Sequence, residues 1–303
     1  MHGRLHLLPF AAAAMGIALF AGMDAAMKGL SAALGAYVAM LWRQAFAVGF
    51  SAPFYLATRQ GWPGRSALRF HLMRGAVSAV MAVTWFYGLA RLPMAEAIAL
   101  SFVAPLIALY LAAVMLGETI SRRSIGASLL GLAGMILLVA ARLGAPGERH
   151  LDGVLAILFS AGLYAWNIIL MRQQSQVAGP AEVTFFQSLI SGSWLLLGLP
   201  AALLVSPSLG LVPSPTQWPL LALSAGLTIA SLALLSWAYR RAEAQALVPI
   251  EYSAFVWAAL LGAVFYAERL SLSTVAGALL IVTGCLLASW RPRHVSPVVE
   301  SAA

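Results

Sequence analysis

Runs of about twenty apolar residues alternate with short polar breaks along almost the whole chain. An α-helix rises about 1.5 Å per residue, so about 20 apolar residues cross the roughly 30 Å hydrocarbon core of a bilayer. The pattern therefore predicts ten transmembrane helices, at residues 7–30, 34–58, 70–91, 93–117, 122–142, 152–172, 181–205, 217–240, 244–267 and 271–290. The weakest break is at residues 240–243, which are the only interruption between the eighth and ninth spans.

The two ends of the chain need separate interpretations. The first apolar run continues to residue 30, and this length favours a membrane span over a cleaved signal peptide. Residues 291–303 are polar and contain two prolines, which predicts a disordered cytoplasmic tail.

The composition favours an all-α membrane protein and excludes several other classes. The chain is 62% hydrophobic and only 9% charged, whereas about 25% of residues are charged in soluble domains. Its net charge of +8 comes from scattered basic residues, without the basic stripe typical of nucleic-acid-binding proteins. The single cysteine, Cys285, has no partner for a disulfide or metal site, and no nucleotide-binding or hydrolase motif occurs. We therefore expect no metal, no cofactor, no nucleic-acid partner and no enzymatic activity.

The sequence also repeats itself at a steady register. A shift of 150 residues matches Arg91 with Arg241, Glu118 with Glu268, Ser121 with Ser271, and Gly134 with Gly284. A shift of 144 residues matches Lys28 with Arg172, Ser31 with Ser175, and Gly35 with Gly179. These matches predict two homologous repeats, at residues 7–142 and 152–290. Each repeat holds five spans, so the second must enter the membrane from the opposite side, as in the inverted repeats of secondary transporters.

Basic residues predict the orientation. With the N-terminus inside, eleven Lys and Arg residues fall in cytoplasmic segments and five in outer segments, leaving out Arg43 and Arg74, which lie within spans. Because cytoplasmic segments retain Lys and Arg, we expect both termini in the cytoplasm of a multi-pass protein of the cell inner membrane.

Several segments carry a family resemblance. Gly117-Glu118 before the fifth span, and the segment from Pro249-Ile250-Glu251-Tyr252 to Ala267-Glu268, resemble the EamA type of the drug/metabolite transporter superfamily. The segment from Arg74 to Leu106 and the motif Met40-Leu41-Trp42-Arg43 are similar to S-adenosylmethionine uptake carriers. Those carriers tend to have a Tyr-Arg-Tyr-like sequence where this chain has Ile250-Glu251-Tyr252. The resemblance implies solute transport and leaves the substrate and direction open.

Charged side chains within spans are candidates for function, because each costs about 2.5–3.5 kcal/mol on insertion scales. Arg43 lies near the middle of the second span. Its guanidinium could hold a substrate carboxylate or phosphate through two parallel hydrogen bonds, and a structural ion pair is the alternative. The repeat places a second polar residue, Gln187, opposite Arg43.

Three further charged residues have competing interpretations. Asp24 precedes Lys28 by four residues, which favours either a local ion pair or a role in proton or cation coupling. Glu251 follows Pro249, which removes a backbone donor and favours a local opening of the helix. Glu251 is therefore a candidate for substrate binding or coupling, and structural pairing is the alternative. Arg74 lies close to the cytoplasmic end of its span, where we expect it to snorkel to phosphate headgroups.

Aromatic and small residues complete the set of candidates. Aromatic clusters suit either an interfacial belt or a cradle for an organic cation or flat ring. Together with one amide, the candidate pocket residues are Trp85, Tyr87, Tyr164, Trp166, Asn167, Trp237 and Tyr252. Glu118 and Glu268, at matched helix ends, are expected to tie neighbouring helices together. Gly134 and Gly284 give smooth faces that favour close helix packing, with a homodimer contact as the alternative.

The sequence is thus typical of a secondary carrier that moves a small polar, zwitterionic or organic-cation metabolite by alternating access. The partners we expect are this small-molecule substrate and the lipid bilayer. A multidrug or amino-acid exporter of the same superfamily is the main alternative. A channel and an integral membrane enzyme are further alternatives, although no catalytic cluster of His, Asp or Cys occurs in the sequence.

Overall fold

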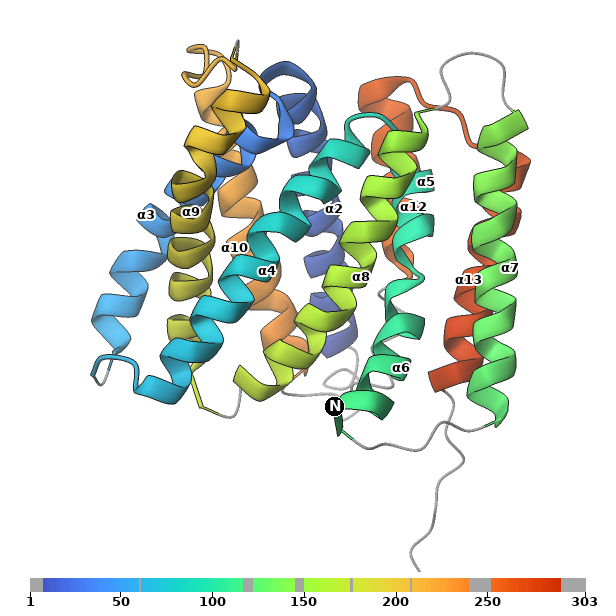
Figure 1. Ribbon diagram of the computed structural model, residues 1–303, viewed down its shortest axis with the longest axis horizontal. Coiled ribbons are helices and arrows are strands. Elements are labelled where there is room, and N and C mark those ends of the chain that lie inside the picture. Colours follow the sequence, from blue (N-terminus) through green and yellow to red (C-terminus); the bar gives the residue numbers. More distant parts are fainter. Residues whose placement is uncertain are drawn as a thin grey trace, which may run out of the picture.

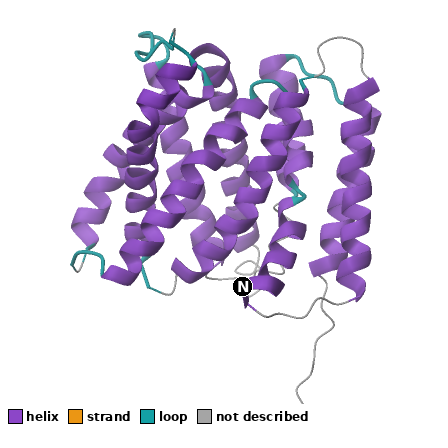
Figure 2. Ribbon diagram, viewed as in Figure 1, coloured by secondary structure: helices purple, strands orange, loops and turns teal. Residues whose placement is uncertain are grey.

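The protein is helical throughout the residues that its computed structural model describes, which are 8–59, 61–116, 122–144, 150–174, 177–207, 209–239 and 252–289. No strand occurs within these ranges (Figure 2). The helices are α2 (Leu8–Leu34), α3 (Ala36–Thr58), α4 (Arg65–Leu89), α5 (Met94–Ser101), α6 (Ala104–Leu116), α7 (Arg122–Gly144), α8 (Leu151–Gln174), α9 (Pro180–Val205), α10 (Trp218–Tyr239), α12 (Ser253–Tyr266) and α13 (Leu272–Ser289).

These helices follow the predicted apolar ranges, except that α2 continues past the predicted end at residue 30 to Leu34, and with two further differences. The third predicted range begins at residue 70, but α4 already begins at Arg65. The fourth range was predicted as one helix and is divided into α5 and α6. At the division, the Val103 backbone nitrogen bonds to Leu100 three residues back, at 3.3 Å. Pro105, in the first turn of α6, has no backbone N–H to continue the pattern of α5.

Within the described residues, five helices are long and apolar enough to cross a membrane: α2, α4, α8, α9 and α10. Shorter apolar segments occur in α5 and α6, in α7, in α12 and in α13. Many large apolar side chains are exposed, including Val114, Leu197 and Leu272. Exposure of this kind is expected where lipid covers the protein.

The helices pack mainly with partners that lie far away in the sequence. The chief pairs are α2 with α10, α7 with α13, α4 with α8, α3 with α9, and α4 with α9. Figure 1 shows these helices side by side in one bundle, with α7 and α13 at one edge. The first residue of α2 and the last residue of α13 lie at the same end of the bundle, the lower end in Figure 1.

Glycines allow α7 and α13 to approach closely. A Cβ atom added to Gly134 would lie 2.6 Å from the Gly277 carbonyl oxygen. A Cβ atom added to Gly277 would lie 3.0 Å from the Gly134 carbonyl oxygen and 2.5 Å from the Leu138 side chain. The smooth face predicted at Gly134 thus meets α13 at Gly277 within one chain, because only residues without a Cβ let the two backbones approach this closely.

Gly134→Ala should therefore destabilise the protein by about 1–3 kcal/mol, as expected for overpacking. Thermal unfolding of purified protein in detergent measures this effect. Gly126→Ala in the same helix is the matched control, because a Cβ there would meet nothing within 4 Å. If the two variants unfold at the same temperature, the glycine contact does not support the α7–α13 pair.

Candidate functional site

Arg43 lies in the interior of the bundle, where α2, α3, α4 and α10 meet. It follows the first residue of α3 by seven positions, or about 10 Å along the helix. Arg43 is only 8% exposed. Its site is thus in the upper half of the bundle, somewhat nearer the upper end than the middle position predicted from the sequence.

The Arg43 guanidinium has weak partners for a buried cation. Its Nη1 donates to Thr228 Oγ1 at 3.1 Å and to Met23 Sδ at 3.4 Å, and its Nη2 donates to Met40 Sδ at 3.2 Å. Its Cζ lies 5.4 Å from the centre of the Phe86 ring. Thioether sulfurs are weak acceptors, and the buried Nε atom has no hydrogen-bond partner. The site can therefore accept a further anionic or hydrogen-bonding group.

Asp24 lies close to this site but does not form a contact ion pair with Arg43. Asp24 is 1% exposed, and its Oδ1 accepts a hydrogen bond from Trp85 Nε1 at 3.1 Å. The two residues interact electrostatically, but no nitrogen–oxygen distance between them falls within 4.0 Å. The structure thus brings together three predicted site residues, namely Asp24, Arg43 and Trp85.

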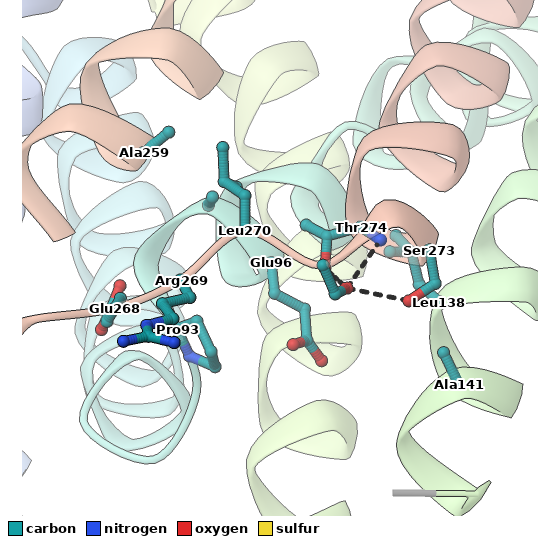
Figure 3. Close-up of a pocket in the computed structure, with 12 residues that line it drawn as sticks. Pro93, Glu96, Leu138, Ala141, Ala259, Glu268, Arg269, Leu270, Ser273 and Thr274 are labelled. Atoms are coloured by element: carbon teal, nitrogen blue, oxygen red, sulfur yellow. Dashed lines mark hydrogen bonds between the residues drawn. The ribbon is translucent and has the colours of Figure 1, made fainter. Parts of the chain in front are cut away.

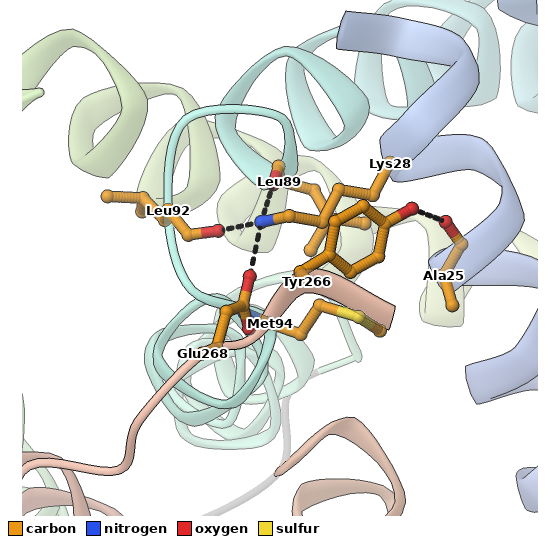
Figure 4. A network of polar contacts seen from close by, with 7 residues as sticks. All are labelled: Ala25, Lys28, Leu89, Leu92, Met94, Tyr266 and Glu268. Atoms are coloured by element: carbon orange, nitrogen blue, oxygen red, sulfur yellow. Dashed lines mark hydrogen bonds and ion pairs between the residues drawn. The ribbon is translucent and has the colours of Figure 1, made fainter. Parts of the chain in front are cut away.

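Lys28 does not pair with Asp24, so that sequence-based alternative is wrong. Its Nζ forms an ion pair with Glu268 Oε1 at 2.8 Å and donates to the carbonyl oxygens of Leu89, at 2.8 Å, and Leu92 (Figure 4). Carbonyls at the C-terminal end of α4 lack helical donors and attract a cation, so Lys28 satisfies them from a neighbouring helix. Glu268 Oε2 also accepts from the Met94 backbone nitrogen at 2.7 Å.

We call Lys28, Glu268 and these backbone groups the upper junction. It joins α2 to the α4–α5 turn and to the segment between α12 and α13 (Figure 4). Glu268 was expected to tie the end of its own span to the start of the next, but its side chain instead contacts Lys28 of α2 and the first residue of α5. Glu118, its predicted counterpart, lies outside the described residues.

Arg74 points into the bundle, so the expectation that it snorkels to headgroups is wrong. Its Nε donates to Asn167 Oδ1 at 3.1 Å, and its Nη1 donates to Gln174 Oε1 at 2.7 Å. The reason is that α8 supplies two amide acceptors, which a single-sequence pattern does not place beside α4. Asn167 also donates to Ser78 Oγ at 2.6 Å.

The same set of hydrogen bonds extends toward the lower end. Gln174 Nε2 lies 2.7 Å from His71 Nδ1, and His71 Nε2 lies 2.9 Å from Glu182 Oε1. His71 and Gln174 are fully buried. We call the set of Glu182, His71, Gln174, Arg74, Asn167 and Ser78 the lower network. His71, Gln174 and Glu182 were not predicted as site residues, because their only signal in the sequence is their polarity near the ends of apolar runs.

The predicted aromatic cradle is not assembled around Arg43 as a unit. Tyr87 lies near the upper end, where its hydroxyl donates to Asp152 Oδ2 at 2.7 Å, whereas Trp85 faces Asp24. Tyr164 and Trp237 are 48% and 37% exposed, and Trp166 is partly buried.

The remaining predicted residues have other surroundings. Gln187 Oε1 is buried without a hydrogen-bond partner, and Asn167 belongs to the lower network. Tyr252 packs edge-on against Phe102 at the division between α5 and α6, with a ring distance of 5.2 Å. Glu251 lies outside the described residues.

A cavity of about 240 Å³ opens near the upper end, away from Arg43. Its lining includes Glu96, Arg269 and Thr274, from α5 and from the segment around the start of α13 (Figure 3). None of the site residues predicted from the sequence lines it. This cavity is smaller than most ligand pockets, which measure about 300–1,000 Å³.

Comparison with known proteins agrees with this architecture. The EamA-like transporter family matches the chain twice, at residues 8–140 and 151–290. The chain belongs to the EamA-like transporter family. This match confirms the resemblance inferred from the sequence, and it makes the chain a multi-pass membrane protein of a family named for transport.

The relatives of this EamA-like chain transport different compounds. It is 26% identical to the pseudopaline exporter of Pseudomonas aeruginosa over 89% of this chain and 92% of the exporter. It is 22% identical to a riboflavin transporter of Brucella anthropi, over 81% and 84% of the two chains. It is 25% identical to an S-adenosylmethionine uptake transporter of Rickettsia bellii, over 71% and 70%. A solved crystal structure with 22% identity shares the fold, with a TM-score of 0.59 over 92% of this chain and 96% of that one.

The upper junction of the EamA-like chain gives a stability prediction. Lys28→Met should lower the unfolding temperature strongly, because Glu268 then keeps a largely buried charge without its partner, a loss of about 3–5 kcal/mol. Combining Lys28→Met with Glu268→Gln should recover part of this loss. Thermal unfolding in detergent measures both.

Asp152→Asn is the matched control at the same end. Asp152 pairs with Arg91 at 2.9 Å, but their side chains are 49% and 35% exposed. Exposed pairs contribute only about 0–1 kcal/mol. If Lys28→Met is no more harmful than Asp152→Asn, the upper junction does not hold the helices together.

Proposed function

We propose that this chain is a secondary carrier of a small polar, zwitterionic or organic-cation metabolite and works by alternating access. The observation that carries the proposal is Arg43, a buried cation whose contacts are one hydroxyl, two thioethers and an aromatic face. A cargo carboxylate would supply the strong partner that Arg43 lacks, through two parallel hydrogen bonds. The names of the relatives support transport of small molecules and leave the cargo and direction open.

The packing supports two inverted halves of five spans each, with α5 and α6 together forming one span. Under that arrangement, the pair α2 and α10 is equivalent to the pair α8 and α4, and both pack closely. Likewise, the pair α10 and α3 is equivalent to the pair α4 and α9. The double match of the family supports the same division, with halves at residues 7–142 and 152–290.

Charge balance around Arg43 suggests how cargo and site fit. Asp24, held by Trp85, offers an anionic group near the Arg43 guanidinium. A zwitterionic cargo would place its carboxylate on Arg43 and its cationic group toward Asp24 and the Trp85 ring. Of the candidate pocket residues, Trp85 reaches this site through its hydrogen bond to Asp24. Asp24 and Glu251 are the coupling candidates carried forward from the sequence.

The main alternative is a multidrug or amino-acid exporter of the same superfamily. The pseudopaline exporter favours it, because that relative matches this chain over most of both sequences. A channel is the weaker alternative. Saturable exchange of labelled for unlabelled cargo in proteoliposomes distinguishes a carrier from a channel.

Arg43→Ala should reduce exchange of cargo by at least about thirtyfold, because truncating one partner of a buried charge pair costs about 2–5 kcal/mol. Arg43→Lys should restore exchange only in part, since an ammonium cannot form the same two parallel hydrogen bonds. Counterflow in proteoliposomes measures the rates, with cargo chosen by a thermal-shift screen of zwitterionic and cationic metabolites. Normal exchange by Arg43→Ala would contradict the binding role.

Arg59→Ala is the matched control for this test. Arg59 caps the lower end of the same helix, is exposed, and lies over the Trp62 ring at 5.2 Å. Its loss should leave exchange within about twofold of the parent rate, since a surface cation–π contact contributes only about 0.5–1 kcal/mol to stability.

The proposed topology is tested by reporter fusions. With ten spans and both termini cytoplasmic, a fusion after Gly144 should report the outer side of the inner membrane, and a fusion after Ala303 should report the cytoplasm. The reason is the eleven-to-five distribution of basic residues between the two sides. Reports of the same side from both positions would refute the inverted arrangement.

A further inference from the structure

The lower network crosses from one proposed half of the protein to the other at the lower end of the bundle. His71, Arg74 and Ser78 come from α4, whereas its other members come from α8 and α9. The network therefore occupies, at the lower end, a position comparable to that of the upper junction at the other end.

The hydrogen bonds of the network fix the proton on His71. Gln174 Oε1 accepts from Arg74, so the Gln174 amide nitrogen faces His71 Nδ1. An amide NH₂ group only donates, so Nδ1 must accept, and the ring proton lies on Nε2. Nε2–H then donates to Glu182 Oε1 at 2.9 Å. The network thus holds His71 as a neutral imidazole, and Glu182 accepts as a carboxylate.

Charge balance determines where an added proton can bind. Arg74 and Glu182 are the two charged members, so the network is neutral as a whole. A proton on His71 Nδ1 would face the Gln174 amide donors, and Gln174 cannot turn over without losing its bond to Arg74. Among the members of the network, no comparable donor prevents a proton from binding to Glu182. Its side chain is 22% exposed, in the first turn of α9, whereas the His71 side chain is fully buried.

Other titratable and charged groups near the network do not bind the added proton in place of Glu182. From α3, Tyr55 packs edge-on against Phe186, whose ring stacks on His71. From α8, Tyr164 interacts electrostatically with Arg74. From α4, Arg65 and Arg69 are exposed at the lower end. Among the described members of the network, Glu182 is the only carboxylate.

We propose that Glu182 is a proton-binding site and that its protonation loosens the contact between α4 and α9 at the lower end. When Glu182 is ionised, the bond from His71 is charge-assisted, and such bonds are roughly twice as strong as neutral ones. Protonation removes that assistance and leaves Arg74 without a compensating charge. This inference rests on the proposed carrier function, to which it gives a coupling ion, the proton.

The route from this proton site to the cargo site is α4 itself. His71, Ser78 and Trp85 are spaced seven residues apart, close to two helical turns, so they follow one face of α4. His71 and Ser78 belong to the lower network, and Trp85 holds Asp24 beside Arg43. A movement of the lower end of α4 is therefore transmitted to the residues that surround the cargo.

The labelling rate of a cysteine at position 191 measures directly how far the contact between α4 and α9 loosens. Ser191 is fully buried on α9, its hydroxyl has no partner, and its backbone nitrogen would lie 3.3 Å from a Cβ at Gly75 of α4. We would introduce Ser191→Cys into a Cys285→Ser background and measure maleimide labelling of the purified protein in detergent from about pH 7 to about pH 4, a range that spans the ordinary pKa values of imidazole and carboxyl groups. Rates are divided by those of Thr216→Cys, an exposed position, to remove the intrinsic pH dependence of thiols.

The normalised labelling rate should rise by about tenfold as the pH falls. Glu182→Gln should label rapidly at every pH, because it imitates the protonated carboxyl. His71→Gln should keep the pH response, since its amide can donate to Glu182 and accept from Gln174. If Glu182→Gln aggregates, Glu182→Asp replaces it and should keep a pH response over a higher baseline.

Three results would overturn the proton site. They are a labelling rate in the parent that does not depend on pH, slow labelling of Glu182→Gln at every pH, and a pH response that survives in Glu182→Gln but disappears in His71→Gln. If Glu182→Asp is used instead, loss of the pH response in that variant would also overturn the proton site. No cargo is present in this assay, so such results would leave the carrier function itself to be decided by counterflow.

Discussion

A charge inside a bundle surrounded by lipid must be satisfied by the protein, and this constraint explains the contacts of the buried Lys and Arg side chains. Water in the hydrocarbon region is not available to solvate an ammonium, guanidinium or carboxylate, and an unpaired buried charge is costly. Lys28 meets the constraint with a carboxylate and two carbonyl groups. Arg74 meets it with two amides that lead to Glu182. Arg43 meets it only in part, which is why it is the residue best suited to bind a cargo anion.

The three polar regions follow one another along the bundle. The upper junction joins α2, α4 and the segment before α13 with a Lys–Glu pair. The Arg43 site lies below it, and the lower network joins α4 to α8 and α9 through a neutral imidazole. In the proposed two-half arrangement, both end regions connect one half to the other. They differ in chemistry, since the lower contact depends on a histidine–carboxylate pair and the upper one on an ammonium.

The sequence predicts the helices well because hydropathy and length are local properties. It also identifies Arg43 and Asp24, since a charge within an apolar run is conspicuous. The division between α5 and α6 was missed, although Pro105 was a signal for it. The contacts of Lys28 and Arg74 could not be predicted, because their partners come from distant helices. The local spacing rule suggested Asp24 for Lys28, but the free carbonyls at the end of α4, together with Glu268, are the stronger partners.

Arg43, whose contacts satisfy its guanidinium only in part, is proposed to bind a cargo carboxylate. The most direct measurement is a thermal shift of the purified protein with a panel of amino-acid-derived zwitterions and their methyl esters, compared between the parent and Arg43→Met. At least one zwitterion should stabilise the parent, its methyl ester should do so far less, and Arg43→Met should lose the difference. Equal stabilisation of the parent and Arg43→Met by the same zwitterion would contradict this binding role.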